Sequence, residues 1–253
     1  MLAVEDLFSV RGKVAIVTGA SSGLGERFAR NLHEHGATVV VGARRLDRLE
    51  ALADELGDRI VPIRCDIAVD EDCERLVAAA GDRIDVLVNN AGIAVPMPAE
   101  DEPVETWRTV LDVNLNGLFV TTQLVARRMI SQRDGSIINI ASILGLVASA
   151  PIRQASYCAA KGAVVSLTRE LACQWARKGV RVNAIAPGWF PTEMTNEKMF
   201  EDDDGMDFLK RNTPMGRGGE LDELDGALLF LASSASSFVT GTTLPVDGGW
   251  TAR

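Results

Sequence analysis

Short apolar runs rich in β-branched residues alternate with helical stretches along most of the chain. The apolar runs are uninterrupted, which is typical of strands buried on both faces in a parallel sheet. The pattern predicts strands at 13–18, 38–41, 60–65, 84–88, 136–140, 180–185 and 242–246. It predicts helices at 24–35, 46–56, 71–80, 104–131 with a break near 114–117, 155–177 and 222–232.

Strands that alternate with helices are joined by right-handed crossovers, which wind the helices over both faces of one sheet. We therefore predict an α/β fold, a Rossmann-type doubly wound parallel sheet of about seven strands in a three-layer αβα arrangement. The 253 residues contain no internal repeat and no linker, so a single domain over 1–253 is expected. A Met- and Phe-containing stretch at about 190–215 is predicted to form a substrate lid, although its apolar residues could instead pack onto the core. The acidic run at 201–204 within it is expected to be a solvated loop.

The composition excludes several classes of function. The only histidines, His33 and His35, lie two residues apart in a helical stretch and face different directions, so neither a histidine-rich metal site nor a histidine-based triad is expected. A net charge of −9 argues against nucleic acid, which is bound by clustered Lys and Arg.

The cellular compartment is predicted from the first residues of the sequence and from the spacing of the cysteines. The four cysteines show no CxxC spacing, and the first residues carry acids without a signal-like apolar segment, which indicates a cytoplasmic protein. An uncharged window at 135–152 contains Asn, Ser, Gly and Pro, and therefore indicates a buried strand followed by a loop and no membrane span.

A glycine-rich turn, TGASSGLG at 18–25, connects the first predicted strand to the first predicted helix. Gly19, Gly23 and Gly25 allow the backbone to turn sharply and to approach a pyrophosphate. The N-terminus of the following helix adds free N–H groups and a positive dipole potential. Because it lies between a strand and a helix of a βαβ unit, the turn predicts a dinucleotide site.

Tyr157, the only tyrosine, and Lys161 are four residues apart in one predicted helix and therefore share a face. A free phenol has a pKa of ~10, and a nearby ammonium favours the phenolate, so the spacing predicts a lowered pKa that suits acid–base catalysis. Ser142 follows the strand at 136–140, at the edge where open α/β sheets bind ligands, and its hydroxyl could bond a substrate oxygen. The alternative is a structural tyrosine, a solvated lysine and an ordinary turn serine.

Taken together, these motifs resemble the short-chain dehydrogenase/reductase family, in the branch of about 250 residues. The spacing TGxxxGxG, the NNAG segment at 89–92, Asn114, Ser142, and Tyr157-x-x-x-Lys161 occur in the family order. Pro187–Gly188, Thr192 and the VDGG segment at 246–249 extend the resemblance over almost the whole chain.

The resemblance implies a role for each catalytic position, and it requires no metal. Tyr157 would donate or accept the proton, Ser142 would stabilise the substrate oxygen, and Lys161 would bind the cofactor ribose and lower the tyrosine pKa. Asn114 would hold a water in a proton relay, although it could equally be a polar residue that breaks a helix. The implied cofactor-binding residues are Gly19, Ser21, Ser22, Gly23, Leu24, Gly25, Arg44, Arg45, Asp66, Ile67, Asn89, Ala91, Gly92, Tyr157, Lys161, Pro187, Gly188, Phe190 and Thr192.

The end of the second predicted strand favours NADP(H) over NAD(H). Family members that prefer NAD usually carry an acid at this position, and here it is Ala43, followed by Arg44 and Arg45, with Arg48 nearby. A charge-assisted Arg–phosphate hydrogen bond contributes about 1.5–3 kcal/mol, which would favour a 2′-phosphate. The alternative is that these arginines are solvated and that NAD(H) binds without an acidic partner.

The resulting hypothesis is an NAD(P)(H)-dependent oxidoreductase, with NADPH preferred, that acts on a small carbonyl or secondary alcohol. A 3-oxoacyl-[acyl-carrier-protein] reductase is the main alternative, since basic residues near helix ends could bind an acidic carrier: Arg127, Arg128, Arg133, Arg177 and Lys178. A non-catalytic nucleotide-binding protein is a further alternative, which the complete catalytic set disfavours. The resemblance implies a homotetramer, or otherwise a homodimer.

Overall fold

The computed structural model describes residues 4–195 and 199–253. Its centre is a seven-stranded sheet in which each neighbouring pair is parallel, in the order β3-β2-β1-β4-β5-β6-β7. The strands are β1 Val14–Thr18, β2 Thr38–Ala43, β3 Ile60–Arg64, β4 Val86–Asn89, β5 Gly135–Ile140, β6 Val180–Pro187 and β7 Thr243–Val246. The predicted doubly wound sheet is therefore confirmed.

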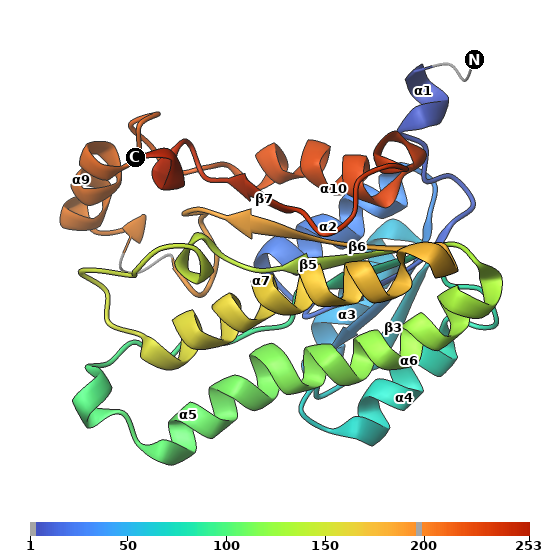
Figure 1. The fold of residues 1–253 in the computed structure, drawn as a ribbon, viewed down its shortest axis with the longest axis horizontal. Coiled ribbons are helices and arrows are strands. Elements are labelled where there is room, and N and C mark those ends of the chain that lie inside the picture. Colours follow the sequence, from blue (N-terminus) through green and yellow to red (C-terminus); the bar gives the residue numbers. More distant parts are fainter. Residues whose placement is uncertain (1–3, 196–198) are drawn as a thin grey trace.

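Helices cover both faces of the sheet, with α2 and α10 on one side and α4 and α6 on the other (Figure 1). The helices are α1 Val4–Leu7, α2 Gly23–Glu34, α3 Leu46–Leu56, α4 Asp70–Ala79, α5 Val104–Leu111, α6 Gly117–Gln132, α7 Ala155–Trp175, α9 Asp203–Asn212 and α10 Asp225–Ala232. Short 3-10 turns lie at Ala99–Asp101, Ile143–Gly145, Ala176–Lys178, Leu221–Leu224, Ser234–Ser236 and Trp250–Ala252.

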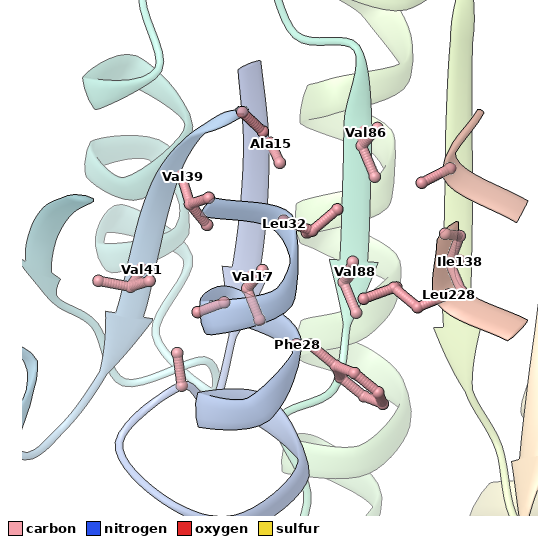
Figure 2. Packing of buried hydrophobic residues seen from close by; sticks show 14 of the residues in the cluster. Ala15, Val17, Phe28, Leu32, Val39, Val41, Val86, Val88, Ile138 and Leu228 are labelled. Atoms are coloured by element: carbon pink, nitrogen blue, oxygen red, sulfur yellow. The ribbon is translucent and has the colours of Figure 1, made fainter. Parts of the chain in front are cut away.

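Alternate strand residues enter opposite halves of the core, which explains why the strands are apolar throughout. In β1, Val17 packs with α2, α3 and α10, whereas Ile16 packs with α4, α6 and α7. Figure 2 shows Phe28 of α2 and Leu228 of α10 beside Val88 of β4, in the same cluster as Val17. Since both faces are covered, the side chains of the central strands β1, β4 and β5 lose nearly all contact with water, and burial is worth about 25 cal/mol per Å² of apolar surface.

The strand order places a crevice at the carboxyl ends of β1 and β4. The chain leaves β1 toward β2 and β3, and then returns to the other side of β1 to form β4, so the crossovers diverge at this point. Open α/β sheets bind ligands at such a switch point. The hydroxyl of Thr18, at the end of β1, accepts hydrogen bonds from the backbone N–H groups of Asn90 and Ala91, both at 3.0 Å, and so joins the two loops.

Two predicted features differ from the structure. The break expected near 114–117 is a π-helical turn, Asp112–Asn116, that connects α5 to α6 without ending the helical path. The acidic run at 201–204 is not wholly a loop, because Asp203 and Asp204 form the first turn of α9. Carboxylates near a helix N-terminus are favoured by the helix dipole, which loop-like composition does not reveal.

The candidate lid has a helix at its centre, and residues 196–198 of it lie outside the described residues. Leu209 of α9 is fully buried, and Phe208 lies 5.7 Å from Trp250 between ring centroids. Met194 is exposed and contributes to the wall of a cavity. One part of the stretch therefore packs onto the core, and another part borders the cavity, while its role as a lid stays a prediction.

Candidate active site

The glycine-rich turn is held against the loop that follows β4. The side-chain amide of Asn90 donates to the carbonyls of Thr18, at 3.0 Å, and Gly19, at 3.2 Å. Gly19 has a φ of +67°, and a Cβ there would lie 2.7 Å from the Cα of Ala91. A Cβ on Gly25 would overlap the carbonyl oxygen of Gly19. Only glycine fits these two positions, and the N-terminus of α2 is consequently open to the crevice as an anion site.

This cradle fits the pyrophosphate of a dinucleotide. A cavity of about 460 Å³ runs from the glycine-rich turn, past the ends of β2 and β3, to the N-terminal part of α7. Its wall includes most of the predicted cofactor residues: Gly19, Ser21, Ser22, Gly23, Leu24, Arg44, Arg45, Asp66, Ile67, Ala91, Gly92, Tyr157, Lys161, Pro187, Gly188, Phe190 and Thr192.

Gly25 and Asn89 are outside the wall of this cavity. Gly25 acts through its close approach to Gly19, as described above. The side chain of Asn89 is buried and donates to the hydroxyl of Thr122, at 2.7 Å, and to the amide oxygen of Asn139, at 2.9 Å, so it connects β4 to α6 and β5. The cavity wall contains Asn90 in its place. Strand alternation explains the difference, because successive side chains point to opposite sides of the sheet.

Lys161 is a buried residue of the cavity wall, one helical turn from Tyr157. Its ammonium donates a 2.7 Å hydrogen bond to the carbonyl of Ile140, the last residue of β5, and lies 5.7 Å from the centroid of the Tyr157 ring. Burial lowers the Lys161 pKa to about 8, because an ammonium out of water has lost its hydration. Burial also raises the Tyr157 pKa, while a hydrogen bond with the Ser142 side chain opposes that rise.

The direction of the tyrosine shift differs from the sequence-based expectation. Lys161 was expected to lower the Tyr157 pKa, but in the protein without ligand the dominant effect on the phenol is its own loss of water contact. The protein therefore holds Tyr157 as a neutral phenol, which is the form that can donate a proton.

Ser142 and Asn114 are both buried beside this pair. Ser142 follows β5 and caps the 3-10 turn Ile143–Gly145 by accepting a 3.1 Å hydrogen bond from the N–H of Leu144. Asn114, in the π-helical turn, accepts from the N–H of Ile93 and donates to its carbonyl, both at 2.8 Å. Ser142 contributes to the cavity wall, whereas Asn114 fixes the backbone of the loop that does so.

Other residues of the cavity wall were missed by the sequence analysis. Asn90, Ile93 and Val113 are close in sequence to predicted positions, so a wider reading of the same motifs could have found them. Glu193 contributes to the cavity wall beside the end of β2 and forms ion pairs with Arg45, at 2.9 Å, and with Arg48. No pattern in the sequence indicates this contact, because the residues it joins are far apart in the chain.

A glycine-rich cradle at the switch point of a parallel sheet, with a half-buried tyrosine beside a buried lysine and a serine at the same edge, defines a dinucleotide-dependent oxidoreductase. A family model described as "Enoyl-(Acyl carrier protein) reductase" matches residues 19–251. The chain belongs to the short-chain dehydrogenase/reductase family.

Relatives of known name match the chain over nearly its full length. A 2-dehydro-3-deoxy-D-gluconate 5-dehydrogenase of Bacillus subtilis is 41% identical, with 99% of each chain covered. A 3-oxoacyl-[acyl-carrier-protein] reductase of Rickettsia bellii is 36% identical, with 96% of this chain and 98% of the relative covered. The crystal structure of a gluconate 5-dehydrogenase from Burkholderia cenocepacia in complex with NADP and tartrate is 39% identical, with a TM-score of 0.92 over 99% of this chain and 100% of that one.

The part of the chain that the structure describes has no helix both long enough and apolar enough to cross a membrane.

Proposed function

We propose that this protein is an NADP(H)-dependent oxidoreductase that interconverts a carbonyl and a secondary alcohol, with Tyr157 as the general acid and base. The observation that carries the proposal is the placement of Tyr157, Lys161 and Ser142 on the wall of the cavity that begins at the glycine-rich cradle. The proposed protein is one domain over 1–253, with 190–215 as the lid on the substrate side.

The residues of the chain then have distinct tasks in reduction. The nicotinamide, when bound, supplies the hydride to the carbonyl carbon. Tyr157, neutral in this environment, donates its proton to the carbonyl oxygen, and Ser142 donates a hydrogen bond to the same oxygen as negative charge develops there. Oxidation is the reverse, with Tyr157 as phenolate accepting the alcohol proton.

Lys161 and Asn114 are proposed to support this proton transfer without contacting the substrate oxygen. Lys161, held by the carbonyl of Ile140, is placed to bind ribose hydroxyls and to favour the phenolate electrostatically when oxidation requires it. Asn114 fixes the Ile93 loop and is the proposed water-holding residue of the relay. The proposed set of cofactor residues keeps the predicted ones and adds Asn90.

Two observations support NADP(H). Ala43 at the end of β2 has no charge to repel a 2′-phosphate, and Arg44 beside it is exposed at the cavity wall with no ion-pair partner among the described residues. The Burkholderia structure described above contains NADP, and its chain is similar to this one over its full length. NAD(H) is the second cofactor to be tested.

For the substrate, we propose first a polyhydroxylated acid or alcohol of the type named for the Bacillus and Burkholderia relatives. The acyl-carrier alternative is supported by the family description and the Rickettsia relative. Its proposed basic patch is poorly placed, because Arg133, Arg177 and Lys178 follow α6 and α7 and precede β5 and β6. They therefore lie at the edge of the sheet opposite the cavity.

We also propose a cytoplasmic homotetramer, or otherwise a homodimer. Val104 and Trp107 of α5 and Phe119 of α6 are exposed apolar side chains on consecutive helices, which would lose water contact in an assembly. The four cysteines, Cys65, Cys73, Cys158 and Cys173, are all free, which suits a reducing compartment. Light scattering at several protein concentrations would measure the assembly, and cell fractionation would locate it.

The test is a panel of ketones and secondary alcohols assayed with NADPH, NADH and their oxidised forms. It should contain gluconate-type acids, neutral polyols and a 3-oxoacyl thioester. Turnover that depends on Tyr157, with a higher kcat/KM for NADPH than for NADH, would support the proposal. A higher kcat/KM with NADH would contradict the cofactor assignment, and turnover of the thioester alone would favour the acyl-carrier alternative.

A further inference from the structure

Three segments far apart in the chain meet at the end of the cavity beside β2. They are the glycine-rich turn after β1, the start of α3 after β2, and the loop after β6. Arg45 donates to the hydroxyl of Ser22 at 2.7 Å and to that of Ser21 at 3.2 Å. The same guanidinium forms an ion pair with Glu193, 2.9 Å away, and Arg48 is bound to the other oxygen of this carboxylate.

The loop that carries Glu193 is seated on the glycine-rich turn. A Cβ on Gly23 would lie 3.2 Å from the Cβ of Thr192, so the two backbones approach closely at the residue before Glu193. Thr192 is itself fixed, since its N–H donates to the hydroxyl of Thr195 at 3.1 Å. The backbone next to Glu193 is consequently held in place, and the carboxylate itself is held by Arg45 and Arg48.

The Glu193 carboxylate is ionised at neutral pH. Hydrogen bonds from Arg48, Arg45 and Ser22 lower the Glu193 pKa to about 2. The group is therefore a surface anion beside two of the three arginines of this region. Arg44 differs from Arg45 and Arg48, because no ion pair joins it to any described residue.

We propose that Glu193 is a cofactor-selectivity residue, whose carboxylate holds Arg45 and Arg48 and so weakens the binding of a 2′-phosphate without weakening that of the rest of the dinucleotide. The inference rests on the proposed NADP(H) function. A phosphate and a carboxylate use the same guanidinium donors, so a 2′-phosphate that enters this region must share or displace Glu193. The two anions also repel each other, and this cost is absent for NAD(H).

The size of the effect is limited by exposure. The side chains of Arg45 and Arg48 are 41% and 46% exposed, and that of Glu193 is 53% exposed. Water screens ion pairs of this kind. We therefore expect removal of the carboxylate charge to strengthen binding of the 2′-phosphate by roughly threefold to tenfold.

The experiment compares two nucleotides that differ only in the 2′-phosphate. Isothermal titration calorimetry would give the Kd of 2′,5′-ADP and of ADP for the wild-type protein, Glu193→Gln and Glu193→Ala. Glu201→Gln is the matched control, since it removes one carboxylate of the same region that is exposed and is not in the cavity wall. Thermal melting of each variant checks that it is folded.

The expected result is a threefold to tenfold lower Kd of 2′,5′-ADP in both Glu193 variants, an unchanged Kd of ADP, and no change in the control. An unchanged ratio of the two dissociation constants would overturn the inference. Weaker binding of both nucleotides would overturn it as well, because Glu193 would then be a clamp that supports the adenosine site.

Failure of the inference can be distinguished from failure of the proposed NADP(H) preference. That preference fails if the wild-type protein binds ADP as tightly as 2′,5′-ADP and uses NADH better than NADPH. The inference fails only if replacement of Glu193 leaves the ratio of the two dissociation constants unchanged or weakens both nucleotides.

Discussion

The ammonium nitrogen of Lys161 lies 5.7 Å from the ring centroid of Tyr157, four residues earlier in α7. This ammonium is bound to the carbonyl of Ile140 at the end of β5, so α7 is tied to the sheet at the wall of the cavity. Both groups have shifted pKa values for the same reason, which is burial. Proton transfer in this protein should therefore be sensitive to pH at both residues.

Tyr157→Phe should lower kcat by ~10²- to 10⁴-fold, because it removes the proton donor while keeping the ring. Binding of NADPH should be unchanged within about twofold, since the phenyl ring fills the same space. Steady-state kinetics and the fluorescence of bound NADPH measure the two effects. Activity close to that of the wild type would refute the role of Tyr157.

The two directions of the reaction should respond to pH in opposite ways. Burial raises the Tyr157 pKa above its usual ~10, so the neutral phenol that reduction needs predominates at neutral pH. Oxidation needs the phenolate, whose population increases as pH rises toward that pKa. The kcat/KM for the alcohol should thus increase between about pH 7 and 10. An alcohol kcat/KM that does not change over this range would show that the tyrosine does not limit oxidation.

Lys161 should make the stability of the ligand-free protein increase with pH. The folded-state pKa is about 8, against 10.5 for the unperturbed group. Between these values the unfolded chain binds a proton that the folded protein has lost, so the free energy of unfolding increases with pH. The full difference corresponds to about 3 kcal/mol.

Lys161→Met is the comparison for that measurement, because it keeps a long side chain and removes the titration. Both proteins are unfolded with denaturant from about pH 7.5 to 10.5. The difference between their free energies of unfolding cancels the contribution of the other titratable groups. As pH rises, the free energy of unfolding should increase more for the wild-type protein than for the variant. If the difference in the free energy of unfolding between the two proteins did not change with pH, the Lys161 pKa would not be lowered in the folded protein.

Arg44→Ala should raise the Kd and KM of NADPH by ~10- to 150-fold, with little change for NADH, if Arg44 supplies the charge-assisted hydrogen bond to the 2′-phosphate. Arg127→Ala is the control, because Arg127 is an exposed arginine of α6 outside the cavity wall. Equal effects of Arg44→Ala on the two cofactors would assign the arginine to another part of the dinucleotide.

Gly25→Ala should impair both folding and cofactor binding, because its Cβ would overlap the backbone carbonyl of Gly19. Gly226→Ala in α10 is the matched control, since a Cβ there meets no atom within 4 Å. In a helix this substitution should stabilise the protein by about 0.5–1 kcal/mol. Thermal melting distinguishes the two, and a Gly25→Ala protein that melts like the wild type would contradict the described packing of the turn.

The layers of the fold and the order of its elements could be predicted from the sequence, because uninterrupted apolar runs and helical periodicity both indicate which faces are buried. The i, i+4 spacing likewise fixed Tyr157 and Lys161 on one face of a helix, and the glycine-rich turn fixed the cofactor end of the cavity. These are local properties, set by neighbours in the chain.

Only the tertiary structure decided which groups meet across long separations and how much water they keep. Glu193 and Arg45 are 148 residues apart, and their ion pair depends on how the loop after β6 settles on the glycine-rich turn. The direction of the Tyr157 pKa shift depends on burial, which outweighs the hydrogen bond with Ser142, whereas the spacing to Lys161 predicted the opposite direction. Contacts and desolvation of this kind arise from packing in three dimensions, and local patterns of residues do not contain them.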